Sequence, residues 1–217
     1  MKKNNLILTG SGVSKESGIP TFRDSSNGIW SKYDPKIVAT SGGWEDNRDI
    51  FIEFWQSVQK EFDKNEYKPN DAHYKIAKLN NRCSLLTTNI DNLHELSGSK
   101  DVIKIHGDIT KERQIEMYDG ELFLENITIP DVVLFGENKR FVSECYELAE
   151  DANAVLVIGS SLLTGELSLL EHAKRCGAEL IEINPSPVKE CPFDRRYTMS
   201  ATEGLDKFLD EDKKHYV

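Results

Sequence analysis

The residues that decide the fold are LILTGSGVS, from Leu6 to Ser14. Three apolar residues with the pattern of a short buried strand lead into a turn that holds Gly10 and Gly12. Glycine lets the backbone turn tightly and approach a phosphate group closely. A helix that starts near Ser14 would point its N–H groups and the positive end of its dipole at that anion. The stretch therefore predicts a strand, a glycine turn and a helix that together bind a nucleotide.

The spacing of these glycines argues against one common class of nucleotide enzyme. Dehydrogenases that transfer a hydride carry G-x-G-x-x-G after the first strand and an acidic residue at the end of the second strand, where it holds a ribose. The chain has neither the full glycine pattern nor that acidic residue. Hydride transfer is therefore a poor fit to the predicted nucleotide site.

The rest of the chain continues the alternation of strands and helices. Continuous apolar runs, typical of strands covered on both faces, occupy 6–8, 84–86, 132–135, 154–158 and 180–183. Apolar residues at three- and four-residue spacing predict helices over 71–79, 140–149, 167–176 and 205–213. The predicted fold class is α/β, with a Rossmann-like, doubly wound parallel sheet and right-handed crossovers.

Two stretches interrupt this alternation, and we expect them to pack together as a small second module. Residues 25–68 are aromatic-rich and partly helical, whereas residues 108–130 are short and polar. The first stretch has a helical stripe that is expected to be core, formed by Phe51, Phe54, Trp55 and Phe62. The Rossmann-like domain is predicted to consist of the remaining segments, 1–24, 69–107 and 131–217.

Composition and charge narrow the class of protein further. No stretch approaches the length of a membrane span, and residues 1–5 lead into too few apolar residues for a secretory signal, so we expect a cytoplasmic chain without a membrane partner. The net charge of −10 argues against a nucleic-acid partner and suits either plain solubility or a basic partner such as a lysine-bearing peptide. No pair has zinc-ligand spacing among Cys83, Cys145, Cys176 and Cys191, so neither a structural zinc nor a disulfide is expected.

Polar residues follow several predicted strands, where ligands bind in parallel sheets. Asn89 and Asp91 follow the second buried run, and their amide and carboxylate groups suit hydrogen bonds to ribose hydroxyls and a carboxamide. His106 follows a short strand-like segment and titrates near neutral pH, as a general base requires, although a lone histidine is more often structural. Residues 159–161 and Asn184 also follow strands and are either phosphate and ribose contacts or turn and helix-cap residues.

Seven motifs along the chain, in the same order, resemble those of the sirtuin family of NAD-dependent protein deacylases. The segment 10–24, GSGVSKESGIPTFRD, resembles the family's signature almost from end to end. The others are DAHY (71–74), TNIDNLH (88–94), IHG (105–107), VVLFGE (132–137), GSSL (159–162) and IN (183–184). The resemblance spans nearly the whole chain.

The resemblance implies an activity and a set of site residues. It implies NAD as co-substrate, an acyl-lysine-bearing protein or peptide as partner, and release of nicotinamide and O-acyl-ADP-ribose. It implies His106 as catalytic base, with Asn89 beside it at the ribose. The implied NAD contacts are Gly10, Ser11, Gly12, Phe22, Arg23, Thr88, Asn89, Ile90, Asp91, Gly159, Ser160, Ser161 and Asn184. The implied peptide contacts are Val133, Leu134, Phe135, Gly136 and Glu137.

The chain departs from the family pattern in three places that bear on chemistry. The ribbon between His106 and Val132 is short and lacks the two C-x-x-C pairs, although in the family that zinc is structural and not catalytic. Thr88 replaces a glutamine that would contact the nicotinamide ribose, and residues 163–165 stand where the family has the V-x-P of the peptide cleft. The tyrosine-and-arginine pattern of acid-selective deacylases is absent from residues 30–33, which favours uncharged acyl groups.

Two other functions remain open from the sequence. An NAD glycohydrolase or ADP-ribosyltransferase would keep Arg23, Asn89 and Asp91 but use the peptide cleft differently, and Thr88 and the altered cleft favour it. A module that senses NAD or ADP-ribose without turnover would not need His106. The retained histidine and the Phe135–Glu137 segment favour the deacylase.

Overall fold

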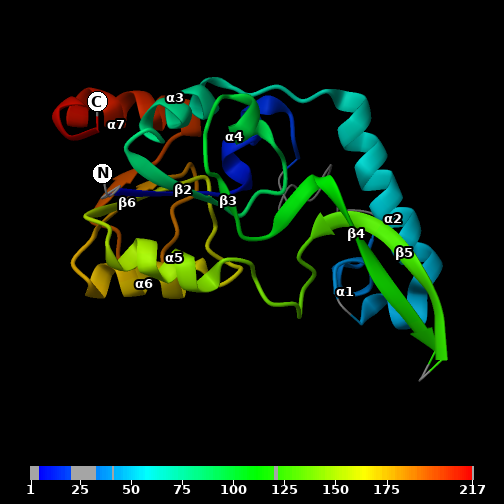
Figure 1. Ribbon diagram of the computed structural model, residues 1–217. Helices are drawn as coiled ribbons and strands as arrows, with labels where there is room; N and C mark the ends of the chain where they lie inside the picture. The colour runs from blue at the N-terminus through cyan, green and yellow to red at the C-terminus, as the bar shows by residue number, and fades with distance from the viewer. Residues whose placement is uncertain (1–4, 21–32, 41, 120–121, 217) are drawn as a thin grey trace.

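A computed structural model describes residues 5–20, 33–40, 42–119 and 122–216, and its centre is a six-stranded sheet (Figure 1). The strand order is β3-β2-β1-β6-β7-β8, and every neighbouring pair is parallel. The strands are β1 (Asn5–Thr9), β2 (Cys83–Thr87), β3 (Ile103–Lys104), β6 (Ala154–Ile158), β7 (Glu179–Ile183) and β8 (Arg195–Tyr197). The predicted Rossmann-like parallel sheet is confirmed, and four of its strands coincide with predicted apolar runs.

Helices cover both faces of this sheet, which explains the continuous apolar runs. Side chains alternate across a strand, so Leu6 and Leu8 of β1 face one layer and Ile7 faces the other. The first layer is α5 (Val142–Glu150) with α6 (Glu166–Arg175), and the second is α3 (Asp71–Leu79) with α7 (Ala201–Tyr216). Figure 1 shows these two layers on opposite sides of the strands. All four predicted helices are present: α3 has the predicted bounds, and the ends of the other three are shifted.

The predicted helix from Ser14 is wrong. Two short 3₁₀ turns stand there instead, at Ser11–Val13 and Lys15–Ser17. Gly18 ends the second turn in the left-handed region, with φ of 86°, and Pro20 disfavours helical backbone in the residue before it. The segment therefore leaves the sheet as a compact turn and presents no long helix dipole to a phosphate.

The run Val132–Phe135 is not a strand of the parallel sheet, contrary to the prediction. Val132 ends β5 (Leu122–Val132), which pairs antiparallel with β4 (Gly107–Asp119) in a separate two-stranded sheet. The sequence looked uniformly apolar, but the burial alternates: Val132 and Leu134 are buried, whereas Phe135 is 55% exposed. Alternating burial is typical of a strand with one covered face, and here the cover is the long helix described next.

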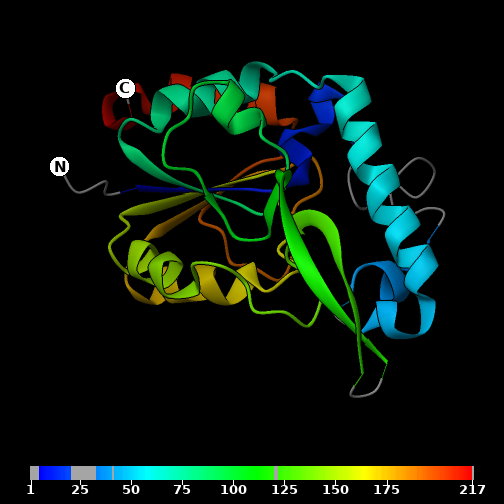
Figure 2. The same ribbon diagram turned by 45° about the vertical axis from the view of Figure 1, so that its right-hand side comes forward.

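The β4–β5 hairpin packs on α1 (Pro35–Val38) and α2 (Gly43–Asn65), away from the parallel sheet (Figure 2). The expected aromatic stripe of α2 forms this core, with Phe51, Phe54 and Trp55 buried and Phe62 packed at its edge. From the hairpin, Ile127 and Ile129 complete it. Apolar contact across this interface is therefore what holds the helices and the hairpin together.

Local polar contacts fix the chain where it enters the second helical layer. Asn70 caps α3 by accepting hydrogen bonds from the backbone N–H groups of Ala72 and His73, and the His73 ring accepts one from the Asn70 backbone. Asn70 also donates to the Val13 carbonyl at 2.8 Å, which ties α3 to the glycine turn.

Within the described ranges, no helix is long and apolar enough to cross a membrane.

The packing of α2 on the hairpin predicts the effect of emptying its core. Phe54→Ala removes a ring that is 1% exposed and should lower the free energy of unfolding by about 3–5 kcal/mol. Ile50→Ala, on the same helix but 42% exposed, is the matched control and should change it by less than about 0.5 kcal/mol. Urea unfolding followed by circular dichroism measures both. Equal effects of the two substitutions would contradict the assigned core.

Candidate functional site

Among the described residues, His106 and the predicted NAD contacts lie at the carboxyl edge of the parallel sheet. Thr9 at the end of β1 pairs in register with Thr87 of β2 on one side and with Ile158 of β6 on the other. The chain runs outward from β1 through β2 to β3 and then returns to β6 beside β1, so the strand order reverses here. Such a switch point leaves a crevice between the loops, which is where open α/β sheets bind ligands.

Two glycine turns meet backbone to backbone at this switch point. The Gly12 N–H donates to the Gly159 carbonyl at 2.9 Å. A Cβ atom on Gly10 would lie 2.7 Å from the Ser160 Cα, and one on Gly12 would lie 2.8 Å from the Gly159 Cα. Gly159 itself has φ of 60°, in the left-handed region that favours glycine. In this structure the predicted phosphate-binding glycines serve first to let the two loops touch.

A buried polar cluster lies beside these turns, at the end of β2. The Asn89 amide donates to the Ser14 hydroxyl at 3.0 Å, and Ser14 donates to the Asp91 carboxylate at 2.9 Å. All three side chains are less than a tenth exposed, and burial raises the pKa of Asp91 above its ordinary value. Sequence analysis predicted Asn89 and Asp91 but not Ser14, whose only signal was its place in the signature segment. A carboxyl group shifted by burial inside a crevice is typical of a functional site.

Two further histidines, His73 and His94, are buried close to this cluster. The Thr9 hydroxyl donates to Thr87 at 2.8 Å and lies 2.9 Å from the Nε2 of His94, from which it accepts. His73 lies next to His94, with ring centroids 5.0 Å apart. Burial lowers the pKa of His73 to about 4 and that of His94 to about 3, so both rings are neutral near pH 7. These contacts give both rings a structural role.

His106 lies between β3 and β4 with its ring directed at the loop after β2. Its Nδ1 is 3.2 Å from the Thr88 carbonyl oxygen, an acceptor, so Nδ1 carries the proton and Nε2 is the free nitrogen. Burial lowers the pKa of His106 most strongly; Lys139 also lowers it, whereas Glu166 and the Thr88 carbonyl raise it. The ring is therefore a neutral base with a defined tautomer, as general base catalysis requires.

A carboxylate that sequence analysis missed lies next to this ring. Glu166 Oε1 is 3.9 Å from the His106 Nε2, and the Glu166 side chain is only 1% exposed. Lys139 Nζ lies 2.9 Å from the same oxygen, and Thr164 donates to the carboxylate from both its hydroxyl and its N–H group. Burial opposes ionisation, but these donors outweigh it and hold the pKa of Glu166 below its ordinary value. Glu166 lies between the motif that ends at Leu162 and the one that begins at Ile183, so no motif reached it.

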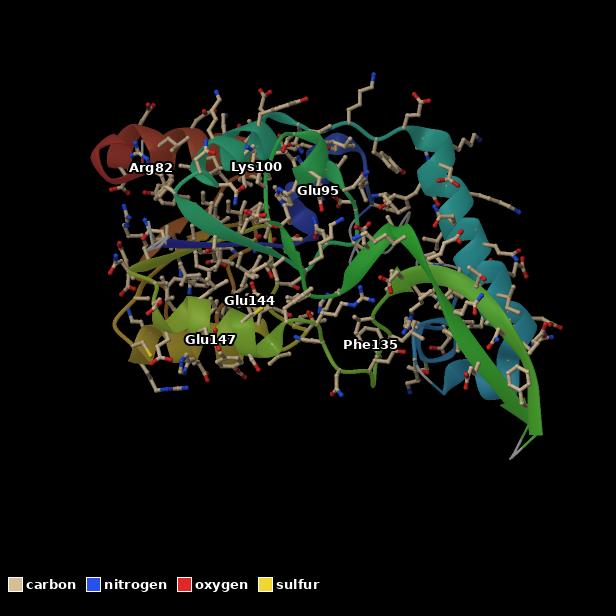
Figure 3. The ribbon with its side chains drawn as sticks, in the orientation of Figure 1. Arg82, Glu95, Lys100, Phe135, Glu144 and Glu147 are labelled. Carbon is tan, nitrogen blue, oxygen red and sulfur yellow. The ribbon has the colours of Figure 1, made fainter. Side chains whose placement is uncertain are left out.

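The predicted peptide-binding segment 133–137 runs directly beside His106. The Val133 N–H donates to the His106 carbonyl at 2.9 Å, so the two segments are joined by backbone. Leu134 is buried in the α2 core, and Glu137 accepts two hydrogen bonds at 2.9 Å from Arg113. Phe135 projects from the loop between β5 and α5 and is exposed (Figure 3). The structure thus leaves Phe135 accessible, while Leu134 and Glu137 hold the loop in shape.

The predicted adenosine contacts also have structural duties. Asn184 donates to the Ser160 carbonyl at 2.7 Å and accepts from the Ser186 N–H at 3.1 Å, and the Ser160 hydroxyl accepts from the Leu162 N–H. These are turn contacts, the alternative that the sequence left open. Ser161 is half-buried on the same turn as Gly159. Contacts of these residues with NAD stay a prediction.

A cavity of about 290 Å³ opens beside the polar cluster, between α2 and α4 (Leu93–Leu96). Asp91 and Ile19 line it from the sheet side, and Phe62 and Tyr67 line it from the side of α2.

The remaining predicted NAD contacts lie in two places. Thr88, half-buried, donates from its hydroxyl to the Thr9 carbonyl, and the Ile90 carbonyl accepts from the Ile109 N–H. The predicted contacts Phe22 and Arg23 lie outside the described residues. Among the residues that are described, no three His, Cys, Asp or Glu side chains gather as metal ligands do.

The fold and this edge define an α/β protein with a nucleotide site next to a neutral histidine base. A family profile described as "Sir2 family" matches residues 10–164. The chain is 37% identical to an NAD-dependent protein deacylase of Archaeoglobus fulgidus, over 98% of this chain and 92% of that protein. It is 34% identical to an NAD-dependent protein deacylase of Vibrio parahaemolyticus, over 96% and 95% of the two chains. The chain therefore belongs to the Sir2 family of NAD-dependent protein deacylases, the sirtuins.

Solved structures of this family share the architecture. A Sir2 homologue in complex with NAD superposes with a TM-score of 0.83 at 28% identity, covering 98% of this chain and 90% of that one. A structure of Sir2 with a deacetylated p53 peptide and 3′-O-acetyl ADP ribose superposes with a TM-score of 0.78 at 27% identity, covering 96% and 93%. The predicted family and its doubly wound fold are confirmed.

The two buried histidines predict a loss of stability in acid. Their pKa values in the folded chain lie below the ordinary value of 6.5, so protonation favours the unfolded chain as the pH falls below about 6.5. Each should cost about 2 kcal/mol of unfolding free energy between about pH 7.5 and pH 5. His94→Asn should flatten this dependence by about that amount, as measured by urea unfolding at both pH values. His172→Asn, on the surface helix α6, should keep the full dependence; an equal slope in all three proteins would contradict the assignment.

Proposed function

We propose that this chain removes acyl groups from lysine side chains of a protein or peptide, with NAD as co-substrate and nicotinamide and O-acyl-ADP-ribose as products. The observation that carries the proposal is the bond from His106 Nδ1 to the Thr88 carbonyl, which holds this ring on the loop after β2 that also carries Asn89 and Asp91 of the buried cluster. An amide, a hydroxyl and a carboxyl group in one dry crevice fit a carboxamide and a ribose. When bound, NAD supplies the ribose carbon from which nicotinamide leaves.

The chain's own residues divide this work by position. Asn89 and Asp91, with the Ile90 backbone, bind the nicotinamide ribose and the carboxamide, and Thr88 lies next to them. The two glycine turns and Ser161 hold the phosphates and the remaining ribose. His106 takes a proton at Nε2 from a ribose hydroxyl, and its bond from Nδ1 to the Thr88 carbonyl keeps the ring oriented while it does so. Phe22 and Arg23 are proposed to shield the sugar carbon and pair with phosphate.

The acyl-lysine enters beside segment 133–137. Phe135 is exposed beside this segment, so a peptide can contact its ring, and the deacetylated p53 peptide of the related Sir2 structure is a precedent for such a partner. Residues 30–33 lack the pattern of acid-selective deacylases, so the acyl group is proposed to be uncharged.

A second candidate function has its own support at the same site. Thr88 stands where the family has a glutamine, and Glu166 follows the altered segment 163–165 and lies buried beside His106. A changed ribose contact and a changed cleft favour water or another acceptor over acyl-lysine. NAD hydrolysis or ADP-ribosyl transfer is therefore the alternative reaction, whereas a non-catalytic NAD sensor would have no use for an oriented histidine base.

Product analysis separates these reactions. The protein is incubated with NAD, with and without an acetyl-lysine peptide, and the products are identified by mass spectrometry. We expect O-acetyl-ADP-ribose only when the peptide is present, and His106→Ala should reduce its formation by at least about 100-fold because the base is lost. His172→Ala, a histidine on α6, should retain full turnover. Free ADP-ribose without any acetylated product would sink the deacylase in favour of hydrolysis.

Zinc is proposed to be dispensable for this protein. The hairpin is held on α2 by apolar side chains, and the chain has no paired cysteines between His106 and Val132. Dialysis against EDTA should therefore leave both the melting temperature and the rate of deacylation unchanged, and elemental analysis of the purified protein should find no stoichiometric zinc. A loss of either property that added zinc restores would contradict this expectation.

A further inference from the structure

Glu166 is a buried acid whose position is not explained by packing alone. It is the first residue of α6, and its side chain is 1% exposed. A carboxylate in the interior is costly unless charged and hydrogen-bonding partners surround it. Lys139 and Thr164 supply these partners, and the N-terminal end of α6 favours a negative charge at that position. The site therefore holds an ionised carboxylate at neutral pH.

The only titratable ring near this carboxylate among the described residues is His106. Glu166 Oε1 lies 3.9 Å from Nε2, the nitrogen that the Thr88 bond leaves without a proton. At this distance the carboxylate attracts a positive charge on the ring but does not occupy Nε2 with a hydrogen bond. When Nε2 takes up a proton, the new imidazolium faces an anion that is already in place.

We propose that Glu166 is a positioning residue that acts through His106, because its carboxylate stabilises the imidazolium that forms when Nε2 takes the proton of a ribose hydroxyl. The inference rests on the proposed function and deepens it. In the step itself, the O–H bond of the ribose breaks and an N–H bond forms at Nε2. Glu166 remains ionised throughout and takes no proton.

Three groups surround the ring, each from a different element, and their effects on it differ in sign. Glu166 comes from α6, Lys139 from the loop between β5 and α5, and the Thr88 carbonyl from the loop after β2. Glu166 and the carbonyl favour the protonated ring, whereas Lys139 and burial disfavour it. Lys139 is bound to Glu166, so the positive charge of one partly cancels the effect of the other's negative charge on His106. Removing the charge of Glu166 should therefore lower the pKa of His106, and removing the charge of Lys139 should raise it.

The test compares Glu166→Gln with Lys139→Met. Glutamine keeps the size of the side chain and one acceptor oxygen for Thr164 but removes the charge. For Glu166→Gln, the acidic limb of the pH profile of kcat/KM should move down by about one pH unit, and kcat should fall while KM for NAD stays within about twofold. For Lys139→Met, the acidic limb should move up, since the cation that opposes protonation of His106 is gone and the Glu166 carboxylate remains. Glu171→Gln, an exposed acid on the same helix, is the matched control and should leave the limb in place.

The histidine ring can also be titrated directly, without any substrate. Proton–carbon NMR of the imidazole Cε1–H of His106 should show a lower pKa in Glu166→Gln and a higher one in Lys139→Met than in the unmodified chain. If these shifts occur but no acetylated product ever forms, the proposed deacylation fails while the coupling of Glu166 to His106 stands. If deacylation occurs and neither the titration nor the pH profile moves, the positioning role is overturned.

A folding defect would not leave the inference undecided. If Glu166→Gln fails to fold, Lys139→Met alone carries the test, because it keeps the carboxylate and changes only its partner. An unchanged or lowered titration of His106 in Lys139→Met would then overturn the proposal. A raised titration would support it.

Discussion

The contact between two backbone turns, at Gly10–Gly12 and at Gly159, is the constraint on which the site depends. With side chains on these residues the turns could not approach, since a Cβ atom would lie within 3 Å of the opposing backbone. The contact lies where β1 pairs with β6, and the end of β2 lies on the other side of β1. Ser14 then reaches from the first turn to Asn89 and Asp91, so glycine packing and the polar cluster are parts of one arrangement.

The β4–β5 hairpin depends on α1 and α2 for its stability, because a hairpin alone is at best marginally stable in water. Its long strands are covered by α2, where buried aromatic rings meet Ile127 and Ile129. The Trp55 N–H also donates to the Val38 carbonyl at 2.9 Å, which fixes α1 against the same core. The module in turn supports the site, since Val133 and His106 are joined by backbone where the hairpin begins and ends.

Most strands of the parallel sheet and the helices that cover it could be predicted because their signals are local. Continuous apolar runs marked β1, β2, β6 and β7, and helical periodicity marked the helices between them. The run Val132–Phe135 misled because a strand with one covered face and a buried strand look alike over four residues. Asn89, Asp91 and His106 were predicted from motif and chemistry together. Ser14 also stood in a motif, but its hydroxyl acts on partners 75 and 77 residues away. Such partnerships are set by the fold and leave no local pattern.

Glu166 shows the same limit where it matters for chemistry. It lies 60 residues from His106 in sequence, beyond the last motif residue before α6, and its neighbours Thr164 and Gly165 look like an ordinary loop. Only the parallel packing of β2, β1 and β6 brings the start of α6 to the loop after β3. An interior carboxylate persists when its partners offset the cost of removing it from water, and here one partner, Lys139, is itself a charge that acts on the base. The Lys139–Glu166 ion pair thus has two effects. It stabilises the first turn of α6, and it sets the proton affinity of His106, so a substitution in the pair changes both.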